Sequence, residues 1–480
     1  MSDVETGTIT TKVPGRLDRL PWSRWHWMIV IGLGTVWILD GLEVTIVGNL
    51  SAQLAKPGSG LDITQAQVAG TAAALYVAGA CSGALFFGWL TDRFGRKKLF
   101  IITLVVYLVA TLLTAFSFSA WWFFLFRFIT GFGIGGEYAA INSAIDELIP
   151  SRHRGRIDIV INGSYWLGAA GGALLTVPLL NDLPVYIGWR IAFGLGVVLG
   201  LAILFVRRNV PESPRWLFIH GRAREAEQLV DDVERQIGAD DLPEPDKAIT
   251  IHQRKSIGFV RIAHTMVALY PKRTVLGLSL FIGQAFLYNA ITFGYAQILS
   301  TFFKIDTYTG YYFAVIALGN FFGPLLLGHL FDTIGRIPMI SATYIGSGVL
   351  LLGTAWLFNE GALTAVTLTA CWSLVLFVAS AGASSAYLTV SEIFPMETRA
   401  MAIAFFFAIG TAAGGIAGPL VFSSLVESGV PGDTALAFAI GAIVMIAGGL
   451  VELFLGVKAE RKGLEDIAAP LSAAESTKTA

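Results

Sequence analysis

The sequence predicts an all-α membrane protein of twelve transmembrane helices, arranged as two six-helix halves. Three observations carry this prediction. Hydrophobic residues make up 55% of the chain and charged residues only 14%, whereas soluble domains carry about 25% charged residues. Twelve apolar stretches are long enough to cross a bilayer. Most Lys and Arg residues fall into alternate connecting segments, as membrane topology requires.

The composition also argues against several classes of protein. A net charge of −1 gives no basis for a nucleic-acid partner. The two cysteines, Cys81 and Cys371, lie in separate apolar stretches, without the spacing of a metal site or a disulfide framework. No metal and no cofactor are therefore expected. Roughly the first twenty residues are polar, so no cleaved signal peptide is expected either.

The predicted spans follow from stretches without Asp, Glu, Lys or Arg, because ~20 apolar residues cross a bilayer. Two spans, 25–50 (helix 1) and 121–146 (helix 4), are interrupted by charge. The other ten are 63–91, 99–126, 159–181, 191–206, 274–303, 307–331, 337–359, 361–391, 400–426 and 434–451. The short sixth span, 191–206, extends outward through Trp189 and Arg190.

The basic residues predict the orientation of these spans. If both termini are cytoplasmic, 29 of the 33 Lys and Arg residues fall in cytoplasmic segments, and only Lys56 and Lys304 fall in outside loops. Arg127 and Arg190 lie within helices. Since cytoplasmic segments are enriched in Lys and Arg, we expect a multi-pass protein of the cell (plasma or inner) membrane with both ends in the cytoplasm.

The resulting boundaries divide the chain into five parts. They are an N-terminal tail (1–25), a six-helix bundle (26–207), a central cytoplasmic loop (208–273), a second bundle (274–457) and a C-terminal tail (458–480). Within the central loop, Ala226, Leu229, Val230 and Val233 have the spacing of a short amphipathic helix over 222–237. The acidic, proline-containing stretch 239–246 is typical of a flexible linker.

An internal repeat relates the two bundles. The stretch Gly88-Trp-Leu-Thr-Asp-Arg-Phe-Gly-Arg-Lys-Lys98 matches Gly328-His-Leu-Phe-Asp-Thr-Ile-Gly-Arg336 at an offset of 240 residues. Glu147-x-x-Pro-x-x-x-Arg154 matches Glu392-x-x-Pro-x-x-x-Arg399 at 245, and the Gly171–Gly172 pair matches Gly414–Gly415 at 243. Three matches in one order at nearly one period indicate duplication of a six-helix unit.

These motifs resemble the major facilitator superfamily, whose signature is the loop Gly-x-x-x-Asp-Arg-x-Gly-Arg-Lys. Arg127 followed by glycines 131, 133 and 135, the Glu147–Gly155 motif and the Pro-Glu-Ser-Pro-Arg sequence at 211–215 are similar to sugar porters and metabolite or aromatic acid:proton symporters. The similarity covers nearly the whole chain except about twenty residues at each end. It implies alternating access to a central cavity lined mainly by helices 1, 4, 7 and 10.

Charged residues of the repeated motifs predict a cytoplasmic gate that could hold the two halves together while the cavity faces outward. Glu147 and Glu392 each precede an arginine by seven residues, or two helical turns, although a proline intervenes. The alternative, that basic loops merely hold the protein positive-inside, accounts for Lys97 and Lys98 but not for these glutamates. The predicted gate residues are Asp92, Arg96, Glu147, Arg154, Asp332, Arg336, Glu392 and Arg399.

Helices 1 and 4 carry charge near mid-span, where charge is costly and usually functional. Glu43 lies seven residues before Leu50, ~10 Å from the outer helix end, and Arg127 lies at a matching depth, ~9 Å below the same surface. The two residues can therefore pair. Asp40 is nearer the midplane, and Glu137 lies in the inner half of helix 4.

The pair predicts a proton site. The resemblance places the sugar porters' proton-binding acid at Glu43 and its partner at Arg127, while Asp40-Gly-Leu-Glu43 is similar to the Asp-Gly-x-Asp pattern of some aromatic acid symporters. A carboxylate beside arginine stays ionised, and burial favours its protonated form once the arginine is drawn away. A substrate carboxylate could compete for Arg127, the one deep cation. The alternative is a static ion pair that only fixes helix packing.

Polar and aromatic residues of the inner helices form the candidate substrate site. Gln284 and Asn289 are placed there by the resemblance, because sugar porters have a Gln and an Asn at that spacing. Each remaining residue could instead hydrogen-bond between helices, and Glu137 also suits a structural or gating role. Trp166 and Trp372 could stack on a ring. The full set is Gln284, Asn289, Tyr288, Asn162, Trp166, Asn320, Tyr387 and Glu137.

Departures from the sugar porter pattern leave the substrate open. Ala169 stands near the place of a second glutamine, and Ala383-Ser-Ser-Ala-Tyr387 replaces Gly-Pro-x-x-Trp. No nucleotide loop or nucleophile–base pair is present, so no enzyme is expected. Three functions remain: a proton symporter for an organic acid, aromatic acids included; a sugar or polyol porter; or a non-transporting sensor. Either carrier would bind a small molecule. The other expected partners are protons and the lipid bilayer, and the protein is expected to function as a monomer.

Overall fold

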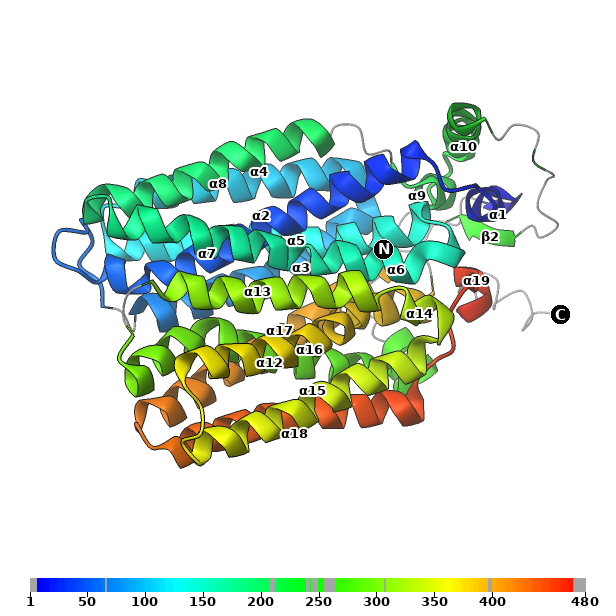
Figure 1. Cartoon of the computed structure of the whole chain (residues 1–480). Coiled ribbons are helices and arrows are strands. Elements are labelled where there is room, and N and C mark those ends of the chain that lie inside the picture. Colours follow the sequence, from blue (N-terminus) through cyan, green and yellow to red (C-terminus); the bar gives the residue numbers. More distant parts are fainter. Residues whose placement is uncertain are drawn as a thin grey trace.

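Two helical bundles lie side by side in the computed structural model (Figure 1). The structure describes residues 7–64, 67–207, 212–238, 242, 249–253, 264–305, 308–395 and 399–468. Part of the acidic linker predicted at 239–246 therefore lies outside the described residues. The helices run roughly parallel, as expected for segments that cross one bilayer.

The first bundle contains the predicted helices 1 to 6. They are α2 (Arg24–Leu54), α3 (Ala73–Phe94) after a π-helical turn (Gln67–Ala72), α4 (Arg96–Ala115), α5 (Ala120–Leu148), α6 (Ser151–Gly163) with α7 (Tyr165–Asn181), and α8 (Val185–Arg207). The third helix ends at Ala115, so the charge-free stretch that continues to 126 belongs to two helices. The predicted fifth helix is interrupted at Ser164.

The second bundle contains the predicted helices 7 to 12. They are α12 (Pro271–Phe303), α13 (Thr309–Leu327) with the short α14 (Leu330–Thr333), α15 (Arg336–Asn359), α16 (Ala365–Ile393), α17 (Arg399–Glu427) and α18 (Pro431–Leu455). The five-part division of the chain at residues 26, 208, 274 and 458 stays a prediction.

The packing repeats between the bundles, as duplication of a six-helix unit requires. Helix α2 packs on α7 as α12 packs on α17, and α3 packs on α5 as α13 packs on α16. The third equivalent pair is α4 on α8 and α15 on α18. Between the bundles, α3 contacts α17, α7 contacts α13, and α6 contacts α13, α14 and α16.

The outer surface is apolar, which is the arrangement that a bilayer selects. On α4 the exposed residues Ile101, Val105, Val109 and Leu112 recur every three to four positions and form one continuous stripe. A soluble protein rarely exposes so much contiguous apolar surface. In the part of the chain that the structure describes, nine helices are long and apolar enough to cross a membrane. The other predicted spans correspond to α5, α6 with α7, and α8, so the count of twelve is consistent with the fold.

Short elements gather at one end of the bundles (Figure 1). They are α1 (Val13–Asp18), α9 (Pro214–Ile219), α10 (Ala223–Ile237), α19 (Leu464–Ile467) and the strands β1 (Gly7–Thr11) and β2 (Ile249–Gln253). Helix α10 occupies the segment whose apolar spacing predicts a helix, and Ala226, Val230 and Val233 are buried. The two strands were not predicted from the sequence. They pair antiparallel, with Gly7 opposite Gln253.

Helices α2 and α7 approach so closely that glycine is required at their contact. A Cβ atom added to Gly168 would lie 1.8 Å from the carbonyl oxygen of Ile38. One added to Gly41 would lie 1.8 Å from the carbonyl oxygen of Tyr165. Both obstructing atoms belong to the backbone and cannot rotate away. The contact fixes the position of α7, which carries part of the central cavity.

We expect Gly168→Ala to lower the free energy of unfolding by about 1–3 kcal/mol, because the added methyl forces the two helices apart. Gly171→Ala on the same helix is the matched control, since nothing lies within 4 Å of a Cβ atom there. Thermal unfolding in detergent measures the difference. Equal unfolding midpoints for the two variants would show that the close contact between α2 and α7 does not determine the stability of the protein.

Candidate functional site

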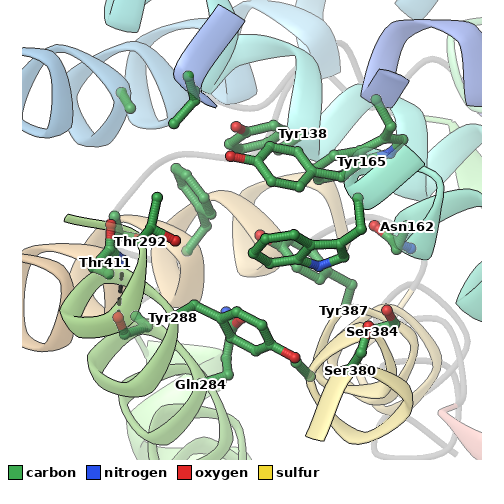
Figure 2. A pocket seen from close by; sticks show the side chains of 18 of the residues that line it. Tyr138, Asn162, Tyr165, Gln284, Tyr288, Thr292, Ser380, Ser384, Tyr387 and Thr411 are labelled. Carbon is green, nitrogen blue, oxygen red and sulfur yellow. Dashed lines mark hydrogen bonds between the residues drawn. The ribbon is translucent and has the colours of Figure 1, made fainter. Parts of the chain in front are cut away.

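A cavity of about 160 Å³ lies between the two bundles, near the middle of the helices. Its lining residues come from α2, α3, α5, α6 and α7 of the first bundle and from α12, α16 and α17 of the second. In Figure 2, Tyr138 and Tyr165 face the cavity from one side, opposite Gln284 and Tyr288. The resemblance implied lining mainly by helices 1, 4, 7 and 10, and predicted helices 2, 5 and 11 also contribute.

Six of the eight predicted substrate residues line this cavity. They are Asn162, Trp166, Gln284, Tyr288, Asn289 and Tyr387. Asn320 lies behind them, fully buried, where it accepts a hydrogen bond from the Tyr288 hydroxyl at 3.1 Å. Glu137 is not among the lining residues, and it accepts a hydrogen bond from Thr103 of α4 at 3.4 Å. Trp372 packs on Phe438 and does not line the cavity either.

Aromatic rings form most of the wall. Trp37 and Tyr138 stack with their ring centroids 4.6 Å apart and their planes within 6°. Tyr138 then meets the edge of Phe407 from the other bundle at 4.6 Å. On the opposite wall, Trp166 faces Tyr288 across the bundle boundary at 5.2 Å. Aromatic pairs of this geometry add stabilisation beyond their buried area, so the walls also hold the bundles together.

The polar groups of the cavity are amides and hydroxyls. They belong to Asn162, Gln284, Asn289, Thr292, Ser380, Ser384 and Thr411, several of which appear in Figure 2. The interruption at Ser164 places Asn162 at the end of α6 and Trp166 at the start of α7. Among the lining residues that the structure describes, none is charged. The cavity can therefore stack a flat ring and exchange hydrogen bonds with neutral polar groups.

The predicted partners Glu43 and Arg127 lie together beside the cavity. Arg127 Nη1 donates to Glu43 Oε1 at 2.7 Å, and each side chain is only 2% exposed. Thr111 donates to the second carboxylate oxygen at 3.3 Å. The guanidinium group also lies over the Tyr76 ring, 4.7 Å from its centroid. Tyr76 lines the cavity and Arg127 does not, so the Tyr76 ring lies between the guanidinium and the cavity.

Asp40 lies one turn before Glu43 on α2 and is buried. It is close enough to Tyr76 and Tyr165, which both line the cavity, to interact with them electrostatically. Two acids of one helix therefore lie behind the aromatic wall. Arg127 binds one of them directly.

Four residues of the predicted gate meet at the end of the bundles that carries α9 and α10. Arg336 donates through Nε and Nη2 to the two carboxylate oxygens of Glu392, both at 3.0 Å, and through Nη1 to Asp332 at 2.9 Å. Arg336 and Glu392 are at most 2% exposed. The fork of a guanidinium suits this two-pronged contact, which a lysine cannot reproduce.

The first bundle contributes Arg154 and the backbone of Arg156. Arg154 Nη1 lies 3.8 Å from Glu392 Oε1, and the Arg156 N–H donates to Asp332 at 2.7 Å. Gly155 allows this approach, because a Cβ atom there would lie 2.2 Å from Arg336 Nη1. The cluster thus connects both bundles through charges that water does not reach.

The other predicted gate residues have different surroundings. Glu147 accepts a hydrogen bond from the hydroxyl of Ser213, just before α9. Arg399 donates to the carbonyl oxygen of Ser391 at 2.6 Å. The side chains of Asp92 and Arg96 lie outside what the structure describes.

Several lining residues were not predicted, chiefly Trp37, Tyr76, Tyr138 and Phe407. Each lies in an apolar helix, where an aromatic side chain is expected against lipid or in the core just as often as in a cavity. No charge or polar spacing distinguishes these positions. Only the packing of distant helices brings their rings together.

Comparison with known proteins agrees with this arrangement. Residues 25–470 match the model of the family described as "Sugar (and other) transporter". The chain belongs to the sugar (and other) transporter family. It is therefore a multi-pass membrane transporter of the major facilitator superfamily, and its relatives are carriers rather than enzymes.

The names of similar proteins specify different transported compounds. The chain is 27% identical over 455 residues to the niacin transporter NiaP of Acinetobacter baylyi, covering 94% of this chain and 98% of the relative. It is 26% identical to the 4-hydroxybenzoate transporter PcaK of the same organism, covering 82% and 84%. The solved proton:xylose symporter XylE shares the fold, with a TM-score of 0.74, 19% identity and coverage of 92% and 98%.

For this transporter, Arg336→Ala should cost about 3–5 kcal/mol of folding free energy, because Glu392 and Asp332 are left buried without their shared arginine. Arg336→Lys should cost less, since it keeps the charge but loses the fork. Arg235→Ala is the control, because Arg235 and Asp232 form an exposed ion pair, and such pairs contribute little. A melting midpoint for Arg336→Ala equal to that of the control would contradict the assigned burial.

Proposed function

We propose that this transporter is a proton symporter that imports a small monocyclic aromatic acid across the inner membrane, with the α9–α10 end in the cytoplasm. The observation that carries the proposal is the cavity wall of Trp37, Tyr138, Trp166, Tyr288 and Tyr387, interrupted by side-chain amides. Each chain contains a complete cavity, so a monomer suffices.

The size of the cavity favours one ring. A cavity of about 150 Å³ is known to accommodate benzene, and this one has about 160 Å³. A ring lying against Trp166 or Tyr288, whose own ring centroids are 5.2 Å apart, would gain stacking contacts on one face. Asn162, Gln284 and Asn289 would then bind its polar substituents. Two relatives whose names specify niacin and 4-hydroxybenzoate fit this class, since both compounds are single-ring aromatic acids.

Proton coupling is proposed for Glu43, with Arg127 and Asp40 as its charged neighbours. Binding of a ring against Tyr76 would move the aromatic ring that separates the cavity from Arg127. A shift of the guanidinium would weaken its 2.7 Å contact with Glu43, and the buried carboxylate would then favour its protonated form. Substrate and proton would thus be bound in the same state.

Alternating access would use the charge cluster of Arg154, Asp332, Arg336 and Glu392. With Arg154 in contact with Glu392 and the Arg156 N–H bonded to Asp332, the bundles would be joined at the cytoplasmic end and the cavity closed on that side. Opening would separate Arg154 from Glu392 and the Arg156 N–H from Asp332, and entering water would replace these contacts. The pairs of Arg336 with Glu392 and Asp332 lie within the second bundle and would stay formed.

A sugar or polyol porter is the second candidate. Gln284 and Asn289 together with the hydroxyls of Ser380, Ser384 and Thr411 could bind several hydroxyl groups, and the solved relative XylE is a xylose symporter. The aromatic wall weighs against it, because a polyol needs a polar partner for nearly every hydroxyl. A non-transporting sensor is the third candidate. Measured flux of any substrate would exclude it, and absence of flux would support it.

Uptake by purified protein in proteoliposomes tests the substrate class. We expect accumulation of labelled nicotinate or 4-hydroxybenzoate under an inward proton gradient, and no accumulation of xylose or myo-inositol. Trp166→Ala should weaken binding of the ring by roughly 1–3 kcal/mol, through lost stacking and contact area, whereas Trp356→Ala, an exposed tryptophan on α15, should not. Xylose flux without aromatic flux would favour the second candidate, and absence of all flux would favour the sensor.

Glu43→Gln should separate transport from proton coupling, because the amide keeps the size of the side chain but cannot take up a proton. We expect loss of proton-driven accumulation and retention of counterflow exchange. Adding a proton ionophore to the unmodified protein should abolish accumulation in the same way. A Glu43→Gln variant that still accumulates substrate against its gradient would rule out this coupling role.

A further inference from the structure

Helix α6 begins without a cap of its own. Its N-cap residue, Pro150, makes no side-chain hydrogen bond to the first turn, and that turn contains no acidic residue. The first backbone N–H groups of a helix need acceptors, and the partial positive charge there favours an anion. A cap for α6 must therefore come from elsewhere in the chain.

Asp18, at the end of α1, supplies that anion. Its Oδ1 atom accepts a hydrogen bond from the backbone N–H of Ser151, the first residue of α6, at 2.9 Å. The same oxygen lies 3.7 Å from Nη2 of Arg154, one turn further along. Arg152 adds a third link, donating to the carbonyl oxygen of Leu20 at 2.6 Å. One carboxylate thus caps the helix and contacts its gate arginine.

The N-terminal segment that carries Asp18, residues 7–20, is firmly attached to the central segment. Val13, Leu17 and Leu20 are buried, and α1 packs on α9 and α10. Strand β1 pairs along its length with β2. These contacts leave little freedom to the backbone that holds Asp18.

Ion pairs strengthen the attachment. Arg16 contacts Glu234 and Asp231 of α10, both at 2.5 Å, and Arg19 contacts Glu234 at 2.7 Å. Burial alone would raise the pKa of Glu234, but the hydrogen bonds from the two arginines reverse this effect and its pKa is lowered. Glu234 therefore stays ionised at neutral pH and keeps its hold on α1.

Arg154 lies between two acids from different parts of the chain. Asp18 is on one side, and Glu392 of the second bundle is on the other, 3.8 Å from Nη1. Helix α6 itself contacts α13, α14 and α16 of the second bundle. Any change in the position of α6 at its capped end therefore changes the contact between the bundles.

We infer that Asp18 is a positioning residue for closure of the cytoplasmic end: it caps α6 from another element and orients Arg154 toward Glu392. The N-terminal segment, anchored on α10, thereby holds α6 against the second bundle. This role rests on the alternating access proposed above, but not on the identity of the substrate or on proton coupling.

Accessibility of a buried cysteine tests the inference without any substrate. Ile159 of α6 is fully buried and faces Gly328 of the second bundle, so Ile159→Cys becomes reactive only when the bundles separate there. The background is Cys81→Ser with Cys371→Ser. A membrane-impermeant maleimide is applied from the α10 side. Loss of a helix cap and its charge in Asp18→Ala should raise the labelling rate roughly five-fold.

Two further variants divide the role of Asp18 into its parts. Asp18→Asn keeps an acceptor for the Ser151 N–H but loses the charge, so its labelling should lie between those of the unmodified protein and Asp18→Ala. Asp18→Glu should restore most of the protection. Glu225→Gln is the control, because Glu225 pairs with Arg222 on the exposed face of α10, and its labelling should be unchanged.

A second cysteine distinguishes a local shift of α6 from a general destabilisation of the fold. Val177→Cys lies where α7 meets Gly310 of α13, at the opposite end of the bundles, and it is labelled with the same maleimide applied from that opposite side of the membrane. Opening of the cytoplasmic end should leave its labelling unchanged or lower it, whereas a loosened fold would raise both. Equal rates for the unmodified protein, Asp18→Asn and Asp18→Ala would overturn the inference, as would a parallel rise at both reporters. If Asp18→Ala does not accumulate in the membrane, unchanged labelling of Asp18→Asn overturns it alone.

Discussion

Glu392 is held by two arginines that belong to different bundles. Arg336 binds both of its oxygens, and Arg154 approaches from α6. A buried charge has to be neutralised by a partner. Arg336 and Glu392 belong to the same bundle and can stay paired, so separating the bundles at this end leaves Arg154 in need of water or another charge in place of Glu392. The neighbouring features follow from this constraint: Gly155 leaves room for the Arg336 guanidinium, and the Arg156 backbone satisfies Asp332.

The same physical requirement operates differently at Glu43. That carboxylate has one arginine, one threonine hydroxyl and an aromatic ring beside its partner. The cluster at the bundle end includes contacts between the two bundles, whereas the Glu43–Arg127 pair lies inside the first bundle. Separating the bundles would therefore break the contacts of Arg154 and Arg156 with the second bundle and leave the Glu43–Arg127 pair intact. A carrier in which one set of charges joins the bundles and another binds the proton can change either set of contacts without disrupting the other.

Much of this architecture could be predicted because a bilayer imposes simple rules on sequence. Charge-free stretches predicted most of the helices. The depths of Arg127 and Glu43 along their helices predicted that the two residues pair. The repeated motifs identified Arg336 and Glu392 as candidate gate residues. Aromatic lining residues such as Tyr138 could not be predicted, since the rule that places apolar residues in a membrane helix does not say which neighbour they face. Asp18 was missed for another reason: it lies in a polar tail, and its partner Ser151 is 133 positions away.

Pairing of β1 with β2 has a consequence for the order in which the chain is made. Gly7 and Gln253 are opposite each other, so the strand at the start of the chain has no partner until the entire first bundle has left the ribosome. Domains fold as units during synthesis, N-terminal parts first. The sheet can therefore form only after every residue of the first bundle has been synthesised, and the segment that carries Asp18 gains its strand pairing no earlier than that.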